Sequence, residues 1–150
     1  MNMRITPLSV TTVDWNDQTY RILLTGNESG GRLGIFESIC PPNGGPPRHI
    51  HLEEDEVFYV IEGEMAFWLE GAELRRKAGE VAFIPQGKEH TFTVLGSNPA
   101  RFVVHLAPGG MEGFFPVAAA RNLRIPEDKA AVASLALDYN MKITGPPLRL

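Results

Sequence analysis

The sequence predicts an all-β sandwich or barrel that is followed by one C-terminal helix. Between residues 20 and 106, short runs of alternating apolar and polar residues are separated by turns rich in glycine and proline. This pattern is typical of antiparallel sheets and not of βαβ units. Residues 126–139 are instead rich in alanine and carry apolar residues at three- and four-residue steps, as an amphipathic helix requires.

The predicted strands are short and follow one another closely. Residues 26–31 and 62–64 suit hairpin connections, because glycine and asparagine tolerate positive φ angles. Gly79 and Gly87 are expected to act in the same way. The expected strands are 20–25, 32–40, 49–51, 57–61, 65–69, 81–84, 90–95 and 102–106.

The C-terminal helix is expected over about 126–139. Pro126 suits a first helical turn, acidic residues follow it, and Asn140 suits the C-terminal cap. Because Val132, Leu135 and Tyr139 share one face, the helix should pack on the outside of the barrel or on a second subunit.

Two segments next to the strands allow more than one interpretation. We interpret residues 41–47, rich in proline and glycine, as a rigid entry loop that leads into His49, with a docking motif as the alternative. Residues 108–116 are apolar, are predicted to be a loop, and follow the last clear strand. They are a core plug or dimer contact, or else a lid over the mouth of the barrel.

Length and composition indicate one domain over 1–150, because the chain is long enough for one core and nothing in it resembles a linker. Fourteen Lys and Arg against eighteen Asp and Glu give a net charge of −4. This balance argues against binding to nucleic acid or to an anionic membrane. We interpret the basic run Arg75-Arg76-Lys77 as a solvated turn, with a partner contact as the alternative.

Cys40 is the only cysteine, so an intrachain disulfide is impossible. Its position at a strand end predicts a small core residue and not a catalytic thiol. The first residues lack the basic and long apolar regions of a signal peptide, and no window reaches eighteen apolar residues. These features predict a cytoplasmic location.

The most informative motif is His49-x-His51-x4-Glu56, which is joined later by His90. His49 and His51 are two residues apart, so they leave the same face of a strand. Glu56 lies an odd number of residues beyond His51, so a bend or bulge must fall within 52–55. His90 begins an alternation whose apolar residues point inward. The pattern therefore predicts four convergent side chains.

Three imidazoles and one carboxylate suit a single divalent transition metal: Fe, Mn, Ni, Co, Cu or Zn. Four protein ligands around a six-coordinate ion leave two positions for water, O₂ or a substrate. The alternative is a barrel that keeps this shape but binds no ion, since isolated histidines on strands are more often structural.

The two motifs, at about 44–63 and about 79–94, resemble the two sequence motifs of the cupins, which are small double-stranded β-helix (jelly-roll) barrels. The sequence departs from the family pattern at Asn43, where a glycine is usual, and at Val94, where an asparagine is common. The resemblance implies that the metal ligands are His49, His51, Glu56 and His90. It implies that the turns are formed by Gly63, Gly79, Pro85 and Gly87.

Residues 44–51, 54–60 and 107–112 are similar to those of small bacterial cupins that are grouped with quercetinase-like dioxygenases. This similarity implies O₂-dependent cleavage of a small enolisable aromatic substrate, with Glu56 as the catalytic base. The implied substrate pocket consists of Phe58, Phe83, Phe92 and His105. The role of His105 stays open, because strand alternation places it opposite its apolar neighbours.

Two other functions fit the same residues. A metal-dependent isomerase, epimerase or lyase would act on a sugar or keto-acid without oxygen. A non-enzymatic cupin would bind a small molecule without turnover. The family resemblance and open sheet edges also favour a homodimer.

Overall fold

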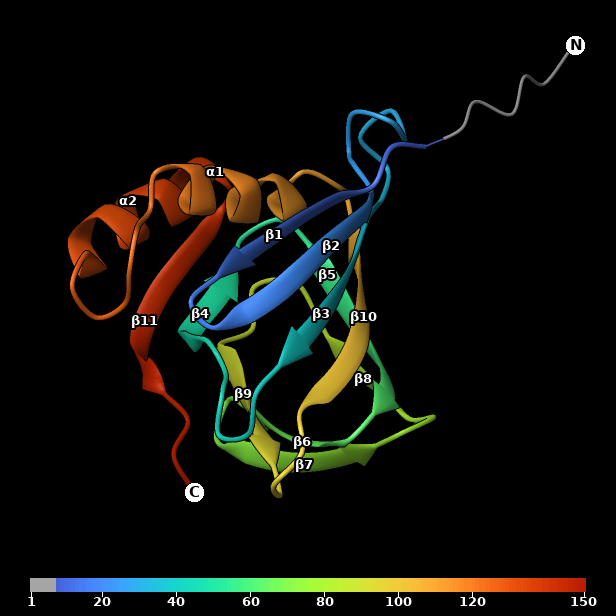
Figure 1. Cartoon of the computed structure of the whole chain (residues 1–150), viewed down its shortest axis with the longest axis vertical. Helices are drawn as coiled ribbons and strands as arrows, with labels where there is room; N and C mark the ends of the chain where they lie inside the picture. Colours follow the sequence, from blue (N-terminus) through green and yellow to red (C-terminus); the bar gives the residue numbers. More distant parts are fainter. Residues whose placement is uncertain (1–7) are drawn as a thin grey trace, which may run out of the picture.

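The computed structural model describes residues 8–150. Two antiparallel sheets face each other in a jelly roll, and the helices lie beside β1 and β11 (Figure 1). The six-stranded sheet has the order β1 (Thr11–Trp15), β2 (Gln18–Leu24), β3 (Gly34–Cys40), β10 (Ala100–Ala107), β5 (Asp55–Glu62), β8 (Val81–Ile84). The five-stranded sheet has the order β11 (Met141–Pro147), β4 (Pro47–His51), β9 (His90–Leu95), β6 (Glu64–Leu69), β7 (Ala72–Lys77). The predicted double-stranded β-helix with a C-terminal helix is confirmed.

The core lies between the two sheets because the strands alternate inward apolar and outward polar positions. In β10, Phe102, Val104 and Leu106 are buried, whereas His105 between them is exposed. In β5, Phe58 is buried and the neighbouring Tyr59 is exposed. This two-residue period fills the barrel with side chains from both sheets.

The chain changes sheets directly after the histidine strand. β4 belongs to the five-stranded sheet and β5 to the six-stranded sheet, and residues 52–54 connect them. The predicted break within 52–55 is therefore confirmed. Its consequence is that Glu56 faces His49 and His51 across the barrel, because the two sheets present their inner faces to each other.

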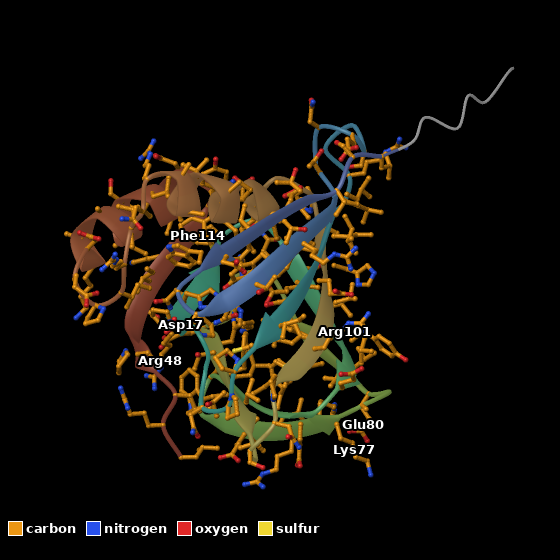
Figure 2. All side chains as sticks on the ribbon, viewed as in Figure 1. Asp17, Arg48, Lys77, Glu80, Arg101 and Phe114 are labelled. Atoms are coloured by element: carbon orange, nitrogen blue, oxygen red, sulfur yellow. The ribbon has the colours of Figure 1, made fainter. Side chains whose placement is uncertain are left out.

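Three strands were not predicted: β1, β7 and β11. The basic run at 75–77 lies within β7, so its interpretation as a turn is wrong. Its backbone pairs with β6, and the exposed Lys77 and the half-buried Glu80 lie where β7 turns towards β8 (Figure 2). Gly145 and two prolines make β11 hard to predict from the sequence. Prolines are tolerated there because β11 is at a sheet edge.

The segment predicted as an apolar loop is helical. Met111–Gly113 form a 3₁₀ turn, η1, and Phe114–Ala120 form helix α1. Helix α2 spans Lys129–Asp138, so it begins three residues later than predicted. Asn140 follows it with a φ of 60°, in agreement with a role in ending the helix. No helix within the described residues is both long and apolar enough to cross a membrane.

Candidate metal centre

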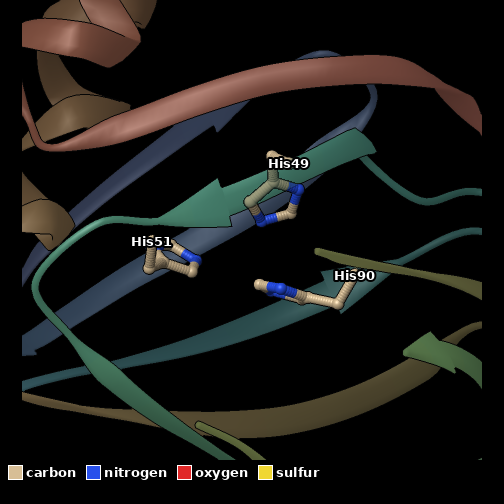
Figure 3. A group of neighbouring side chains, drawn as sticks. All are labelled: His49, His51 and His90. Atoms are coloured by element: carbon tan, nitrogen blue, oxygen red, sulfur yellow. The ribbon is translucent and has the colours of Figure 1, made fainter. Parts of the chain in front are cut away.

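Three imidazoles converge inside the barrel. β4 contributes His49 and His51, and β9 contributes His90, which pairs directly with His49 in the strand register. Each ring offers a nitrogen that lies within 4.8 Å of the others (Figure 3). His51 and His90 are buried, and His49 is half-buried. The two-residue spacing thus brings His49 and His51 to one point, as predicted.

Glu56 joins this group from the opposite sheet. Its Oε2 lies 2.8 Å from His51 Nε2, and its Oε1 lies 3.4 Å from His90 Nε2. The carboxylate is 3% exposed. The structure therefore brings together all four residues that the motif indicated. Glu56 contacts two of the three imidazoles, those of His51 and His90.

Backbone carbonyls fix the tautomer of two of the rings. His49 Nδ1 lies 2.7 Å from the Pro47 carbonyl oxygen, and His90 Nδ1 lies 2.8 Å from the Lys88 carbonyl oxygen. A carbonyl oxygen only accepts, so Nδ1 carries the proton and donates it. The Nε2 lone pair of each ring is then free to bind a cation, which is the arrangement found around metal-ligating histidines.

Several nitrogen atoms in the centre have no hydrogen-bond partner. Within residues 8–150, His51 Nε2 and His90 Nε2 are buried without one, even though Glu56 is close. Unpaired buried polar atoms are costly, so such a cluster is not expected in a merely structural core. A transition metal between the imidazoles and the carboxylate would satisfy these atoms, and the residues present fit such an ion.

Burial and neighbouring charges set the protonation states of these groups. Burial, together with the neighbouring His90 and His51, lowers the pKa of His49 to about 3, so this ring stays neutral. Burial works against the ionised form of Glu56, but His51 and His90 hold its pKa well below the usual range. Burial also opposes protonation of His51, yet Glu56 and Glu54 raise its pKa. A neutral imidazole and an ionised carboxylate are the states that bind metal.

Glu54 was overlooked in the sequence, where it is part of an acidic run between two strands. It is 2% exposed, and its Oε2 lies 3.9 Å from His51 Nδ1. Burial raises the pKa of Glu54, against the opposing effect of His51. Within the described chain this oxygen has no hydrogen-bond partner. Glu54 is thus placed to orient the ring of His51 from behind, as carboxylates do for metal-bound histidines.

A cavity of about 90 Å³ adjoins the centre. His49, His51 and Glu56 line it, and the other lining residues are mostly aromatic and aliphatic side chains from the strands and helices. Phe58 and Phe92 are among them, as predicted. The other aromatic lining residues are Trp15, Tyr20, Phe36, Phe102, Phe114 and Phe115.

Two predicted pocket residues lie elsewhere, so the prediction that they line the pocket is wrong. Phe83 is 53% exposed, because it alternates with the inward Ala82 and Ile84 in β8. His105 is exposed on the outer face of β10. Residues 108–116 do reach the site, since Met111, Phe114 and Phe115 are buried and line the cavity. This placement agrees with the core-plug interpretation.

The chain belongs to the cupin family, because residues 36–112 match the family model described as the cupin domain. Among curated proteins, it is 30% identical over 99 residues to quercetin 2,3-dioxygenase of Bacillus subtilis, covering 66% of this chain and 29% of that protein. It is 32% identical over 89 residues to the tetracenomycin polyketide synthase protein TcmJ of Streptomyces glaucescens, covering 59% of this chain and 60% of that protein. This chain therefore spans less than two thirds of the length of either relative.

Solved structures are similar in fold. KdgF from a Halomonas species superposes with a TM-score of 0.58 at 17% identity, covering 69% of this chain and 90% of that chain. A predicted oxalate decarboxylase from Thermotoga maritima has a TM-score of 0.57 at 21% identity, covering 72% of this chain and 99% of that chain. At these identities the similarity shows the barrel alone.

Proposed function

We propose that this cupin binds one divalent transition metal through His49, His51, Glu56 and His90, and acts as a dioxygenase on a small enolisable aromatic compound. The observation that carries this proposal is the position of the cluster. Imidazole nitrogens without hydrogen-bond partners and an ionised carboxylate converge beside a cavity whose other lining residues are mostly aromatic and aliphatic. Such a cavity fits a flat ring that carries its reactive oxygen atoms at one edge.

When bound, a redox-active metal would supply Lewis acidity and electron exchange with O₂. The protein groups have separate tasks. Glu56 is ionised and can accept the proton of an enol hydroxyl placed beside it. The ring walls, including Phe58 and Phe92, exclude water and hold the substrate by its faces.

The size of the cavity narrows the class of substrate. Its volume of about 90 Å³ is smaller than the roughly 150 Å³ of an apolar cavity that accommodates benzene. A single ring therefore requires only a modest outward shift of the wall, whereas a three-ring flavonol requires a large one. We accordingly propose a one-ring enol as the substrate, although one relative is named for quercetin, a flavonol. That relative matches over only 29% of its length.

The first test is elemental analysis of protein purified without added metal, followed by O₂ uptake with one-ring enols and with 3-hydroxyflavone. We expect a redox-active metal at one per chain, and O₂ consumption with the one-ring enols. Glu56→Gln should lower turnover by about 10²-fold or more while a metal remains bound. Glu53→Gln is the matched control, because Glu53 is close in the chain but exposed.

Three results would overturn the dioxygenase proposal. Zinc as the sole bound metal would argue against oxygen chemistry. Activity on a sugar or keto-acid without oxygen would identify an isomerase, epimerase or lyase. Tight ligand binding with no turnover would identify a binding protein.

A further inference from the structure

We propose that Gln18 selects the substrate, because its side-chain amide is placed to donate a hydrogen bond to an oxygen on the side of the ring remote from the metal centre. This inference rests on the proposed function, since it assumes that the substrate's enol faces the metal. It adds a specificity-determining residue that lies outside both histidine motifs.

The β1–β2 hairpin places Gln18 in the cavity wall. Its two-residue turn consists of Asn16 and Asp17, which have φ angles of 51° and 62°, as in the tight hairpin turns that favour asparagine and aspartate. Asp17 is labelled in Figure 2. Trp15 and Gln18 pair directly across this turn, so their side chains leave the same face. Both side chains line the cavity.

Hydrogen bonds from two hydroxyl groups hold the carboxamide of Gln18. Its Oε1 accepts from the Tyr20 hydroxyl at 3.0 Å and from the Ser38 hydroxyl at 3.4 Å. Tyr20 and Ser38 are paired across β2 and β3, so both hydroxyls come from the inner face of one sheet. The oxygen of the amide is thus occupied, and its orientation is set by the sheet.

The amide nitrogen of Gln18 is not used in the same way. Gln18 is only 5% exposed, and the hydrogen bonds of its side chain within residues 8–150 use Oε1 and not Nε2. Nε2 is not among the fully buried unpartnered atoms of these residues, so it keeps some accessible surface. An accessible donor in a cavity wall can form a hydrogen bond with a ligand oxygen. Nε2 of Gln18 is therefore available to a ligand, and Gln18 is part of the cavity wall.

Two neighbouring donors in the wall are already engaged. Trp15 Nε1 donates to the Leu123 carbonyl oxygen at 2.7 Å, and the Tyr20 hydroxyl donates to Gln18. The ring of Tyr20 also stacks on Phe115 with centroids 3.9 Å apart. Gln18 thus offers a polar contact beside the aromatic side chains of Trp15 and Tyr20, and Asn16 in the hairpin turn is a second polar lining residue.

This arrangement specifies the chemistry of the preferred ligand. A neutral oxygen, such as a hydroxyl or carbonyl, can accept from Nε2. A cationic substituent would meet the donor end of the amide and is disfavoured. A ring with only a methyl group at that position leaves the donor unpaired and should bind more weakly.

The test compares two ligands that differ by one hydroxyl group. Kojic acid is a one-ring hydroxypyranone that carries a hydroxymethyl group across the ring from its enol, and allomaltol has a methyl group in its place. Zinc-loaded protein is used so that binding is measured without turnover, by isothermal titration calorimetry. We expect kojic acid to bind about 2- to 12-fold more tightly, which is the usual worth of one hydrogen bond.

Gln18→Met, which keeps the length of the side chain, should abolish this preference and retain the affinity for allomaltol, which also shows that the variant is folded. Gln18→Leu should do the same. Thr19→Val is the matched control, because Thr19 is the next residue and its hydroxyl bonds to Asp14 instead. In NMR spectra, the side-chain amide signal that is lost in Gln18→Met should shift with kojic acid and not with allomaltol.

The outcomes separate this inference from the proposed function. If neither ligand binds zinc-loaded protein more tightly than metal-free protein, both proposals are overturned. If both ligands bind in a metal-dependent way with equal affinity, only the role of Gln18 is overturned. The same holds if Gln18→Met keeps the preference for kojic acid.

Discussion

Two glutamates, Glu56 and Glu112, are almost completely buried, with exposures of 3% and 1%, and their surroundings differ sharply. Glu112 lies in η1, where backbone amides surround its carboxylate. Its Oε1 accepts from the Gly26 amide, and its Oε2 accepts from the Gly110 amide at 2.6 Å. A Cβ atom at Gly34 would lie 2.6 Å from Oε1, so this glycine leaves room for the carboxylate.

Glu56 lies among imidazoles whose hydrogen bonds are incomplete. Within the described residues, the Nε2 atoms of His51 and His90 have no hydrogen-bond partner. Backbone amides thus satisfy the carboxylate of Glu112, whereas Glu56 is paired with imidazoles whose own hydrogen bonds are incomplete. A buried carboxylate therefore indicates a ligand site only when the polar atoms around it lack hydrogen-bond partners.

The largest effect that this comparison predicts is on stability, at Glu112. Glu112→Ala should lower the free energy of unfolding by about 2–5 kcal/mol, because it leaves the buried amide of Gly26 and the partly buried amide of Gly110 without acceptors. Urea unfolding of metal-free protein would measure this. Glu56→Gln is the counterpart and should lower the metal-free stability by less than Glu112→Ala, because the amide keeps the shape of the side chain and can still bond to the neighbouring imidazoles. Equal losses in the two variants would contradict the comparison.

Side-chain parity explains how much of the metal centre could be predicted. The two-residue step from His49 to His51 and the odd step to Glu56 predicted convergent side chains and a break within 52–55. Only the structure shows that this break is a change of sheet at 52–54. The same rule placed His105 outside, as observed. The family similarity implied that Phe83 lines the pocket, and the alternation in β8 shows why it does not.

Other parts could not be predicted because tertiary packing decides them. The acidic run at 53–55 reads as solvent-exposed, and the burial of Glu54 depends on the position of His51. Gln18 has no motif around it, and its position depends on pairing across a hairpin. β11 contains a glycine and two prolines, so only its pairing with β4 makes it a strand. The homodimer, the single domain and the cytoplasmic location stay predictions.

The next effect concerns metal affinity. Glu54→Gln should weaken metal binding by about 10- to 100-fold, because the ring of His51 loses the carboxylate behind it. Competition with a chromophoric chelator would measure this. Glu53→Gln, with its exposed side chain, should leave the affinity unchanged. An equal response of the two variants would show that Glu54 does not orient His51.

A smaller effect, of about tenfold per pH unit, is expected from protons that compete with the metal at His51. Its pKa lies above the ordinary 6.5 because of Glu56 and Glu54, against the effect of burial. Metal affinity should therefore fall as the pH falls through that raised pKa, whereas His49 stays neutral down to about pH 3. Chelator competition between about pH 6 and pH 9 tests this, and a flat profile would contradict it.

In metal-free protein the contribution of His51 has the opposite sign. A raised pKa in the folded state adds stability that is fully present below the unfolded value of 6.5 and is lost as the pH rises through the folded value. Metal-free protein should therefore lose this contribution on the alkaline side, where metal binding is strongest. Urea unfolding at several pH values, with and without metal, separates the two trends.

The smallest effect is expected at His105, which has the residue type of a metal ligand but lies on the wrong face of its strand. It is a histidine on a strand next to the core, yet it projects from the outer face of β10. His105→Ala should change the free energy of unfolding by no more than about 0.5 kcal/mol, and metal affinity and O₂ uptake should stay at wild-type values. A loss of metal would show that a fourth imidazole reaches the centre. Retained function would show that the inward faces of β4, β5 and β9 define the site.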